Sequence, residues 1–193
     1  MRIGLYGGSF DPIHNAHLLI AQYVLEELSL EKVLFIPSGI PPHKKAFSRP
    51  EQRLQMVKLA IADNPKFEFS DFEIKGSGPS YSVNTIIQLR QQLGSNKSEM
   101  FWIMGSDNFR DFQNWKTPEK ILELCEVVVF PRDRRDAEKF PSKYRHQIHY
   151  LPLAPLIEIS SSKVRDLVRD QRSLRYWVPK VVESFILHEK IYT

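Results

Sequence analysis

Short apolar runs alternate with helical patterns along most of the chain, and this alternation limits the fold more than any other sequence feature. The apolar runs predict strands at Ile3–Tyr6, Val33–Ile36, Phe67–Ile74, Met100–Met104, Val127–Phe130 and Tyr150–Leu153. Between the first five runs, helical periodicity predicts helices at Leu18–Leu28, Pro50–Ala62, Ser82–Leu93 and Pro118–Leu124. Strands that alternate with helices are typical of a parallel sheet with right-handed crossovers. We therefore predict an α/β fold with a Rossmann-like, doubly wound parallel sheet.

Helix-start signals support several of these helices. Pro50 opens the second helix, Ser82 is expected to cap the third, and Thr117 is expected to cap the fourth before Pro118. Two more helices, from about Ser162 to Asp170 and from about Pro179 to His188, are expected to form a small C-terminal helical part. The charged segment 131–147 predicts a long exposed loop. The segment 37–49, rich in proline and glycine, predicts a loop placed to cover a substrate.

Length, composition and charge favour a single domain that binds small anions. A chain of 193 residues with 42% hydrophobic side chains can bury one core, so residues 1–193 are expected to form one domain. The lone Cys125 is expected to be a buried small hydrophobe and suits a reducing cytoplasm. We find no secretory segment and no apolar run of membrane-spanning length. A net charge of +4 without a basic tract favours neither nucleic acid nor membrane as a partner.

The segment from Gly8 to His17 joins the first predicted strand to the first predicted helix and carries two imidazoles. At such a junction the backbone N–H groups lack intrahelical partners, and the helix dipole attracts phosphate. Because the segment has no Gly-Lys-Ser/Thr, we expect His14 and His17 to replace the lysine as side-chain donors to phosphate oxygens.

Two other interpretations of this turn are weaker. A dinucleotide-binding turn would need Gly-x-Gly-x-x-Gly and an acidic residue at the end of the second strand, and both are missing. Zinc could bind His14 and His17, but the sequence offers no second cysteine and no obvious third ligand. We therefore assign no metal-binding residue.

A second anion-binding pattern lies at Ile159–Arg165, where three serines open a helix and an arginine follows one turn later. In the simplest interpretation, Ser160 or Ser161 caps the helix and has no further role. The free N–H groups, the hydroxyls and the forked Arg165 guanidinium would also suit a single phosphate group.

These two segments together resemble the nucleotidylyltransferase superfamily, whose members carry Gly-x-Phe-x-Pro-x-His-x-x-His near the start and Ile-Ser-Ser-Thr-x-x-Arg near the end. Ser162 stands where threonine is common and retains the hydroxyl. The resemblance implies transfer of a nucleoside monophosphate from a triphosphate to a phosphate, with Mg²⁺ carried by the ATP phosphates. It also implies catalytic roles for His14, His17 and Arg165. The implied ATP-binding residues are Gly8, Ser9, Phe10, His14, His17, Gly105, Ser160, Ser161 and Arg165.

Further segments resemble the bacterial nicotinate-mononucleotide adenylyltransferases: Pro41–Lys44, Gly78–Thr85, Ile103–Asp107 and Trp115–Lys116. The implied substrates are ATP and nicotinate mononucleotide, and a homo-oligomer is compatible with the sequence. The residues implied for the mononucleotide are His43, Lys44, Tyr81, Thr85, Asp107 and Trp115.

The chemistry of these residues fits a pyridine mononucleotide. Trp115 can stack on the ring, and Asp107 can accept from ribose hydroxyls. Thr85 and the free amides at the start of the Ser82 helix supply donors, which favour a carboxylate over a carboxamide. Arg132 lacks the Pro-Gly that often follows it in this family, so we do not assign it to adenine or ribose.

Three other functions stay open at this point. A pantetheine-phosphate adenylyltransferase usually lacks the first histidine, and a cytidylyltransferase would leave Trp115 without an obvious role. A non-catalytic nucleotide-binding module could use the same anion sites.

Overall fold

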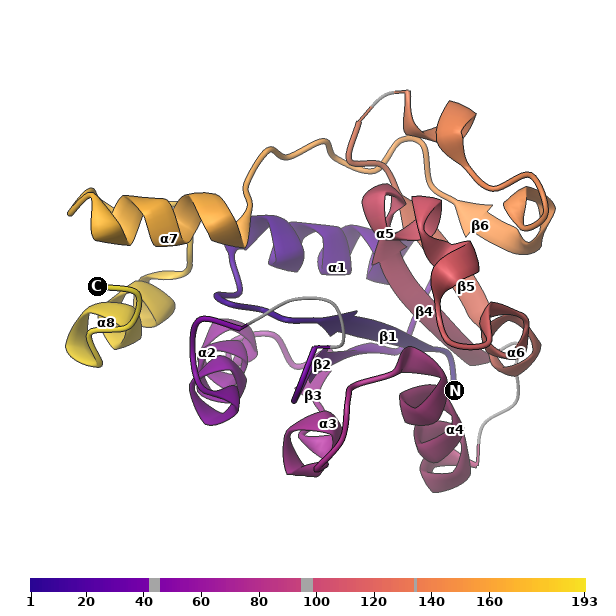
Figure 1. The fold of residues 1–193 in the computed structure, drawn as a ribbon, viewed down its shortest axis with the longest axis horizontal. Helices are drawn as coiled ribbons and strands as arrows, with labels where there is room; N and C mark the ends of the chain where they lie inside the picture. Colours follow the sequence, from indigo (N-terminus) through magenta and orange to yellow (C-terminus); the bar gives the residue numbers. More distant parts are fainter. Residues whose placement is uncertain (42–45, 95–98, 134) are drawn as a thin grey trace.

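The computed structural model describes residues 1–41, 46–94, 99–133 and 135–193, and its strands form one parallel sheet (Figure 1). The strands of this sheet are β1 Ile3–Gly8, β2 Lys32–Pro37, β3 Phe67–Phe69, β4 Met100–Gly105, β5 Glu126–Phe130 and β6 Ile148–Tyr150. They lie in the order β3-β2-β1-β4-β5-β6, and every neighbouring pair is parallel. This confirms the predicted Rossmann-like sheet.

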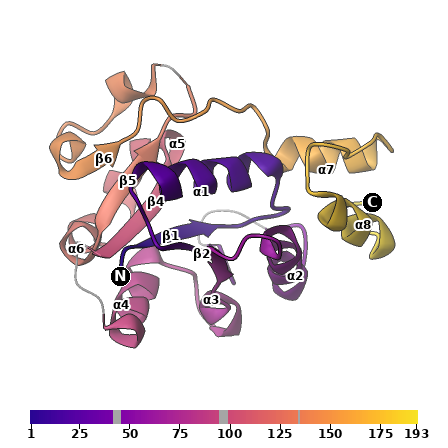
Figure 2. The ribbon, with the colours of Figure 1, turned by 180° about the vertical axis from the view of Figure 1, so that it is seen from behind.

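Helices connect the strands and close the chain. The longer helices are α1 Asn15–Glu27, α2 Pro50–Ile61, α4 Ser82–Leu93, α6 Pro118–Leu124, α7 Ser161–Arg169 and α8 Lys180–His188. The short ones are α3 Phe72–Lys75, α5 Ser106–Arg110 and the 3₁₀ turns η2 Phe112–Asn114, η3 Asp136–Lys139 and η4 Arg145–Gln147. Figure 2 shows α7 and α8 together beside one end of α1, as the predicted small helical part at the C-terminus.

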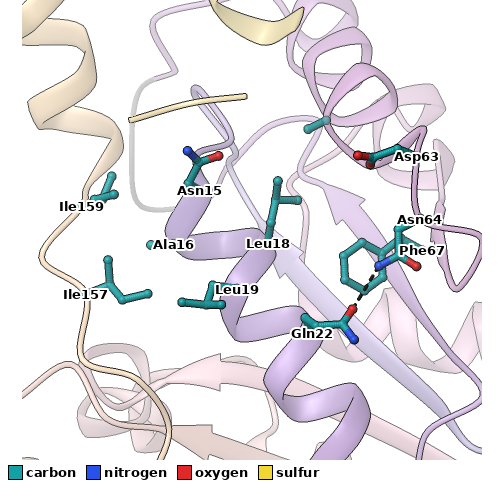
Figure 3. Close-up of a pocket in the computed structure, with 11 residues that line it drawn as sticks. Asn15, Ala16, Leu18, Leu19, Gln22, Asp63, Asn64, Phe67, Ile157 and Ile159 are labelled. Atoms are coloured by element: carbon teal, nitrogen blue, oxygen red, sulfur yellow. Dashed lines mark hydrogen bonds between the residues drawn. The ribbon is translucent and has the colours of Figure 1, made fainter. Parts of the chain in front are cut away.

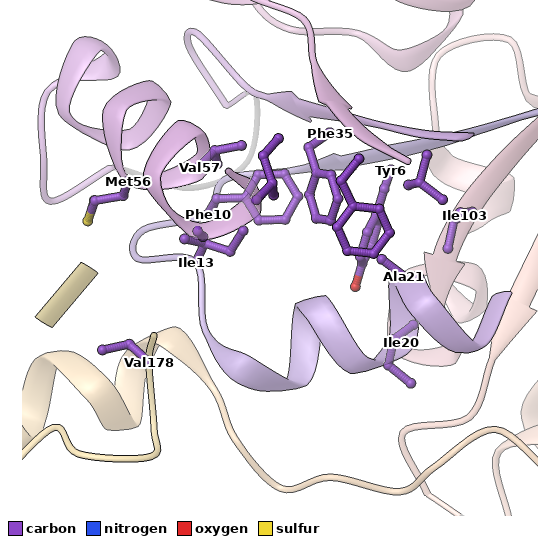
Figure 4. Close-up of a cluster of buried hydrophobic side chains, with 14 of the residues drawn as sticks. Tyr6, Phe10, Ile13, Ile20, Ala21, Phe35, Met56, Val57, Ile103 and Val178 are labelled. Carbon is purple, nitrogen blue, oxygen red and sulfur yellow. The ribbon is translucent and has the colours of Figure 1, made fainter. Parts of the chain in front are cut away.

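The central strands are buried on both faces, as expected for a parallel sheet covered by helices. One face packs against α1, α2, α7 and α8, around Tyr6, Phe10 and Phe35 (Figure 4). The other packs against α4, α5 and α6, around Leu5 and Trp102. In Figure 1, α1 and α4 accordingly lie on opposite sides of β1. Because all strands are parallel, the loops that follow them lie along one edge of the sheet.

Two predicted strands have wrong boundaries. The predicted strand Phe67–Ile74 ends at Phe69, because the Ser70 hydroxyl accepts the Phe72 N–H at 3.3 Å and the chain turns into α3. The strand predicted at Tyr150–Leu153 lies earlier, at Ile148–Tyr150. After the Leu151 N–H has donated to Val129, Pro152 has no N–H to continue the ladder.

Of the two predicted helix caps, the position of Thr117 is confirmed and that of Ser82 is wrong. Tyr81, rather than Ser82, occupies the N-cap position of α4, and its carbonyl accepts the N–H groups of Asn84 and Thr85. Thr117 does stand at the N-cap of α6, but its side chain makes no capping hydrogen bond and its backbone is left-handed, with φ 48°. Helix starts here depend on backbone geometry and on Pro50 and Pro118 more than on hydroxyl caps.

The segment 131–147 is largely exposed, as its charges predict, but two of its aromatic side chains pack on the core. Phe140 and Tyr144 are buried, and their rings meet those of Phe109 and Phe112 edge-on at 5.0 and 5.4 Å. The segment therefore covers part of the α5 face of the core. Cys125 is buried, as expected. Among the described residues, none of the helices is long and apolar enough to span a membrane.

Candidate active site

The two segments with anion-binding patterns and the Gly105 segment meet at the point where the sheet order reverses. β1 and β4 are adjacent, and the helices that follow them cover opposite faces of the sheet. Their carboxyl ends, Gly8 and Gly105, therefore flank the crevice where sheets of this kind bind ligands. A side chain at Gly105 would place its Cβ 2.4 Å from the Asp107 carboxylate, so it would displace that carboxylate from the turn.

Arg53 of α2 supports the turn after β1 through hydrogen bonds to backbone carbonyl groups. It is fully buried and donates to the carbonyl oxygens of Ser9 at 3.4 Å and Gly39 at 2.8 Å, and also to that of Ser38. Burial lowers the pKa of its guanidinium. Sequence analysis missed this residue, although an arginine on the core-facing side of an amphipathic helix is an unusual signal.

The turn itself presents the histidine pair. Phe10 adopts the left-handed backbone region with φ 48°, and its buried ring meets the His17 ring at 5.0 Å. The rings of His14 and His17 stack with centroids 3.6 Å apart. The His14 N–H donates to Nδ1 of His17 at 3.2 Å, so the neutral His17 carries its proton on Nε2. His17 can therefore donate a hydrogen bond without being charged.

Both imidazoles are neutral in this environment. Burial lowers the pKa of His14 to about 3, and the positive charge of Arg132 lowers it further. Burial, His14 and Arg132 together hold the pKa of His17 well below its ordinary value. The Nδ1 atom of His14 is buried and has no hydrogen-bond partner among the described residues. The pair thus provides neutral polar atoms at an anion-attracting turn.

Arg132 brings a positive charge to the site, and the sequence alone did not assign it a role. Its Nε lies 3.8 Å from the Asp107 carboxylate, and its backbone N–H donates to the Ser106 hydroxyl at 2.8 Å. Its guanidinium lies over the Phe130 ring, with Cζ 5.1 Å from the centroid, and its Nε would lie 3.0 Å from a Cβ at Gly105, so Arg132 stands at the carboxyl end of β4. The departure from the family's usual Pro-Gly therefore does not move Arg132 away from the site.

The start of α7 packs directly on the histidine turn. Ser161 Oγ donates to the Pro12 carbonyl at 2.8 Å across 149 positions of sequence, and Arg165 Nη1 donates to the Asp11 carbonyl at 2.7 Å across 154. Arg165 Nη2 donates to Ser162 Oγ at 3.0 Å, which keeps the guanidinium at the first turn of the helix. The two predicted anion segments are thus one surface.

Ser160 has the simpler of the two predicted roles in this structure. Its hydroxyl accepts the Lys163 N–H at 3.2 Å and caps α7. A capped start leaves the remaining N–H groups of the first turn facing outward, where they can still receive an anion.

The acceptor-side residues lie beyond β4 and at the start of α4. The Lys116 ammonium sits 4.4 Å above the Tyr81 ring, which brings Tyr81 next to the segment that carries Trp115. Trp115 is half-buried and its ring packs on Phe112 at 5.5 Å. Asp107 follows β4 directly and is exposed. The predicted His43 and Lys44 lie outside the described residues.

Thr85 is placed differently from the simple donor that we expected. It is buried, and its hydroxyl donates to Oε1 of the buried Glu73 at 2.5 Å. Burial also raises the pKa of Glu73. Because this hydroxyl proton is already used, the backbone N–H groups that open α4 are the better donors for a ligand carboxylate. Glu73 is a second residue that sequence analysis missed, and its polar side chain in a short apolar run was the available signal.

A separate groove of about 630 Å³ lies on another face of the molecule (Figure 3). It runs between α1, the end of α2 and the segment before α7, and its lining is largely apolar, with Leu19, Ile157 and Phe67 among the contributors. A hydrogen bond of 3.0 Å from Asn64 to Gln22 closes one side. The groove contains none of the predicted phosphate or mononucleotide residues.

A parallel sheet with this anion-binding turn at its reversal point, completed by a serine-arginine helix start, defines a nucleotidyltransferase. Consistently, the cytidylyltransferase-like family matches residues 5–167. "Probable nicotinate-nucleotide adenylyltransferase" from Geotalea daltonii is 42% identical over 214 residues, covering 100% of this chain and 98% of the relative. The protein of the same name from Thermus thermophilus is 40% identical and covers 100% of both chains. The chain therefore belongs to the nicotinate-nucleotide adenylyltransferase family, enzymes of NAD biosynthesis.

Solved structures agree on the fold. The Plasmodium falciparum nicotinic acid mononucleotide adenylyltransferase complexed with NaAD superposes with a TM-score of 0.80, covering 99% of this chain and 97% of that chain at 19% identity. A putative nicotinate-nucleotide adenylyltransferase from Vibrio parahaemolyticus gives a TM-score of 0.73 at 18% identity, covering 100% and 96%.

Proposed function

We propose that this chain transfers AMP from ATP to nicotinate mononucleotide, releasing pyrophosphate and forming nicotinate adenine dinucleotide. One observation carries the proposal: Arg165 and Ser161 bind the backbone of the histidine turn, so both anion-binding segments face one ligand. A triphosphate is long enough to contact both. The sequence similarity of the relatives and their names support the choice of nucleotides.

The reaction needs positioning more than a strong base. An oxygen of the mononucleotide phosphate forms a bond to the α-phosphorus of ATP while the bond from that phosphorus to the bridging oxygen of the β-phosphate breaks. The attacking phosphate is already an anion at neutral pH, so no proton has to be removed from it. The protein must hold both anions in line and stabilise the charge that builds on the transferred group.

In this proposal the histidine turn binds the α-phosphate. His17 donates from Nε2, His14 lies beside it, and the N–H groups of the turn formed by Gly8, Ser9 and Phe10 add further donors. Gly105 leaves room for the Asp107 and Arg132 side chains beside this turn. An anion beside the imidazoles would raise their pKa values.

Arg165 and the serines hold the departing pyrophosphate. The guanidinium is kept at the first turn of α7 by the Asp11 carbonyl and the Ser162 hydroxyl. Ser161 fixes the same turn to Pro12, and Ser160 caps it. A forked cation and free N–H groups suit a doubly charged leaving group.

Magnesium is proposed to arrive as part of the substrate, bound by the ATP phosphates. The donors described above are N–H and O–H groups and a guanidinium, which suit phosphate oxygens better than a cation. Within the described residues, histidine, cysteine, aspartate and glutamate form no cluster of three that could hold a metal ion.

The mononucleotide is proposed to bind between α4 and the segment after β4. Trp115 would stack on the pyridine ring, Asp107 would accept from the ribose, and Tyr81 would line the pocket. The N–H groups that open α4 would bind the carboxylate. Roles for Thr85, His43 and Lys44 in the same pocket stay predictions.

A panel assay tests the proposal. Purified protein is incubated with MgATP and one acceptor at a time: nicotinate mononucleotide, nicotinamide mononucleotide, phosphopantetheine or none. We expect pyrophosphate release that depends on an acceptor and is fastest with nicotinate mononucleotide. CTP in place of ATP should be used poorly. Tight ATP binding without acceptor-dependent pyrophosphate would indicate a binding module, and a preference for the amide would overturn the carboxylate assignment.

A further inference from the structure

The last turn of the chain contacts the histidine turn through one phenol. Tyr192 follows α8, and its hydroxyl donates to Oδ1 of Asp11 at 2.6 Å across 181 positions of sequence. The same hydroxyl lies 3.3 Å from the Ser48 hydroxyl. Figure 1 shows the C-terminus beside α8, below α7. The end of the chain thus reaches the proposed ATP site.

The buried carboxylate of Asp11 accepts hydrogen bonds from residues that are far apart in the sequence. Its side chain is buried, and Oδ2 accepts the Phe47 N–H at 2.6 Å. Oδ1 accepts the Ser48 hydroxyl at 2.5 Å in addition to the Tyr192 hydroxyl. A buried carboxylate requires such donors, because leaving one lone pair without a partner costs the desolvation of that group. The position of the Asp11 carboxylate is therefore determined by residues from two separate parts of the chain, the segment 47–48 and Tyr192.

Both ends of Asp11 act on the Arg165 guanidinium. The backbone carbonyl of Asp11 accepts Arg165 Nη1 at 2.7 Å. Its carboxylate holds the backbone of Phe47, whose ring lies against the same guanidinium, 4.0 Å from the ring centroid to Cζ. Arg165 is thus held at one edge by a carbonyl and over one face by an aromatic ring. The Phe47 side chain is 69% exposed, so core packing alone does not explain its place.

We propose that Tyr192, acting through Asp11, is a positioning residue for Arg165 in triphosphate binding. The inference rests on the proposed function, because Arg165 is assigned there to the pyrophosphate end of ATP. Loss of the phenol hydroxyl leaves the Asp11 carboxylate with one donor fewer, so Asp11 and the Phe47 segment shift and the guanidinium is no longer preorganised. The effect falls on ATP and pyrophosphate and spares the mononucleotide.

The test compares Tyr192→Phe with Tyr144→Phe. Both substitutions delete one hydroxyl from a tyrosine that donates to a carboxylate, since half-buried Tyr192 donates to Asp11 and buried Tyr144 donates to Glu119 of α6 at 2.7 Å. We expect Tyr192→Phe to raise KM for ATP and Kd for pyrophosphate by about three- to tenfold, with KM for nicotinate mononucleotide unchanged. Tyr144→Phe should change neither constant. Equal changes for both nucleotides, or none, would overturn the proposal.

A double-mutant cycle tests whether the effect passes through Arg165. In an Arg165→Ala background, Tyr192→Phe should add no further loss of ATP or pyrophosphate binding. Additive losses would contradict the proposal. Should Tyr192→Phe fail to fold, Phe47→Leu removes the ring from the guanidinium at an exposed position, and the same selective loss is expected. An inactive wild type that still binds pyrophosphate, with that binding weakened by Tyr192→Phe, would reject adenylyl transfer and retain the positioning role.

Discussion

The backbone N–H of His14 donates to Nδ1 of His17 at 3.2 Å, and this hydrogen bond decides which ring nitrogen of His17 can donate to a ligand. A neutral imidazole has one donor and one acceptor nitrogen. With Nδ1 occupied as the acceptor, Nε2 must be the donor. This hydrogen bond joins the N-cap residue of α1 to the third residue of the helix. The contact that starts the helix therefore also orients the His17 ring.

Removal of the His17 imidazole should slow the chemical step. We expect His17→Ala to lower kcat by about a hundredfold or more, while ATP binding changes little, because the donor acts mainly on charge formed in the transition state. Steady-state kinetics and ATP titration measure the two effects. His149→Ala is the matched control. His149 lies on the edge strand β6 and pairs with Glu126 of β5, so His149→Ala should retain wild-type kcat. Wild-type turnover in His17→Ala would sink the mechanism.

Stability should fall as the pH is lowered, because His14 is buried in its neutral form. Its pKa is about 3 in the folded protein and 6.5 ordinarily, so the unfolded chain binds the proton first as the pH drops below 6.5. The contribution is complete above that value and is lost progressively toward pH 3. We expect about 2 kcal/mol of lost unfolding free energy between pH 7 and pH 5 from this group.

Urea unfolding at the two pH values checks this prediction. His14→Gln keeps a polar side chain but cannot titrate, so its loss of stability between pH 7 and pH 5 should be smaller by about 2 kcal/mol. An identical pH dependence in wild type and variant would show that His14 is not buried as a neutral group.

Arg53 should contribute strongly to stability. Arg53→Met preserves the length of the side chain but leaves the carbonyl oxygens of Ser9, Ser38 and Gly39 without their donor. Because a donor that satisfies buried carbonyls is lost, we expect a decrease of about 3 kcal/mol in unfolding free energy. Arg49→Met, one helical turn earlier and exposed, is the control and should stay within about 0.5 kcal/mol of wild type. Denaturant unfolding distinguishes the two, and equal small effects would contradict the prediction.

Trp115 should matter for the acceptor more than for ATP. Trp115→Ala removes the flat surface proposed to stack on the pyridine ring, so KM for nicotinate mononucleotide should rise by about tenfold, with a much smaller change for ATP. Trp115→Phe retains a ring and should recover most of the lost affinity. Equal effects on both substrates would argue that Trp115 supports the fold through Phe112 instead of binding the acceptor.

The sequence predicts the parts of the molecule that depend on local pattern. The alternation of apolar runs with amphipathic helices is sufficient for the parallel sheet, since burial on two faces leaves few other arrangements. Glycines, histidines and serines near the ends of the chain mark where phosphate can bind. Errors occur where a local signal competes with tertiary packing. The charges of 131–147 predict exposure, although Phe140 and Tyr144 are buried there, and the Ser82 hydroxyl is not used as a cap.

By itself, then, the sequence determined the fold class and the family, and it predicted two anion-binding segments. Only the tertiary structure decided that these segments form one surface, that Arg53 and Arg132 lie near it, and that the Thr85 hydroxyl donates its hydrogen bond to Glu73. The reason is physical. Periodicity records which side chains are buried, whereas a hydrogen bond depends on which distant donor and acceptor arrive within about 3 Å of each other. The contact of Tyr192 with Asp11 across 181 residues is such an encounter.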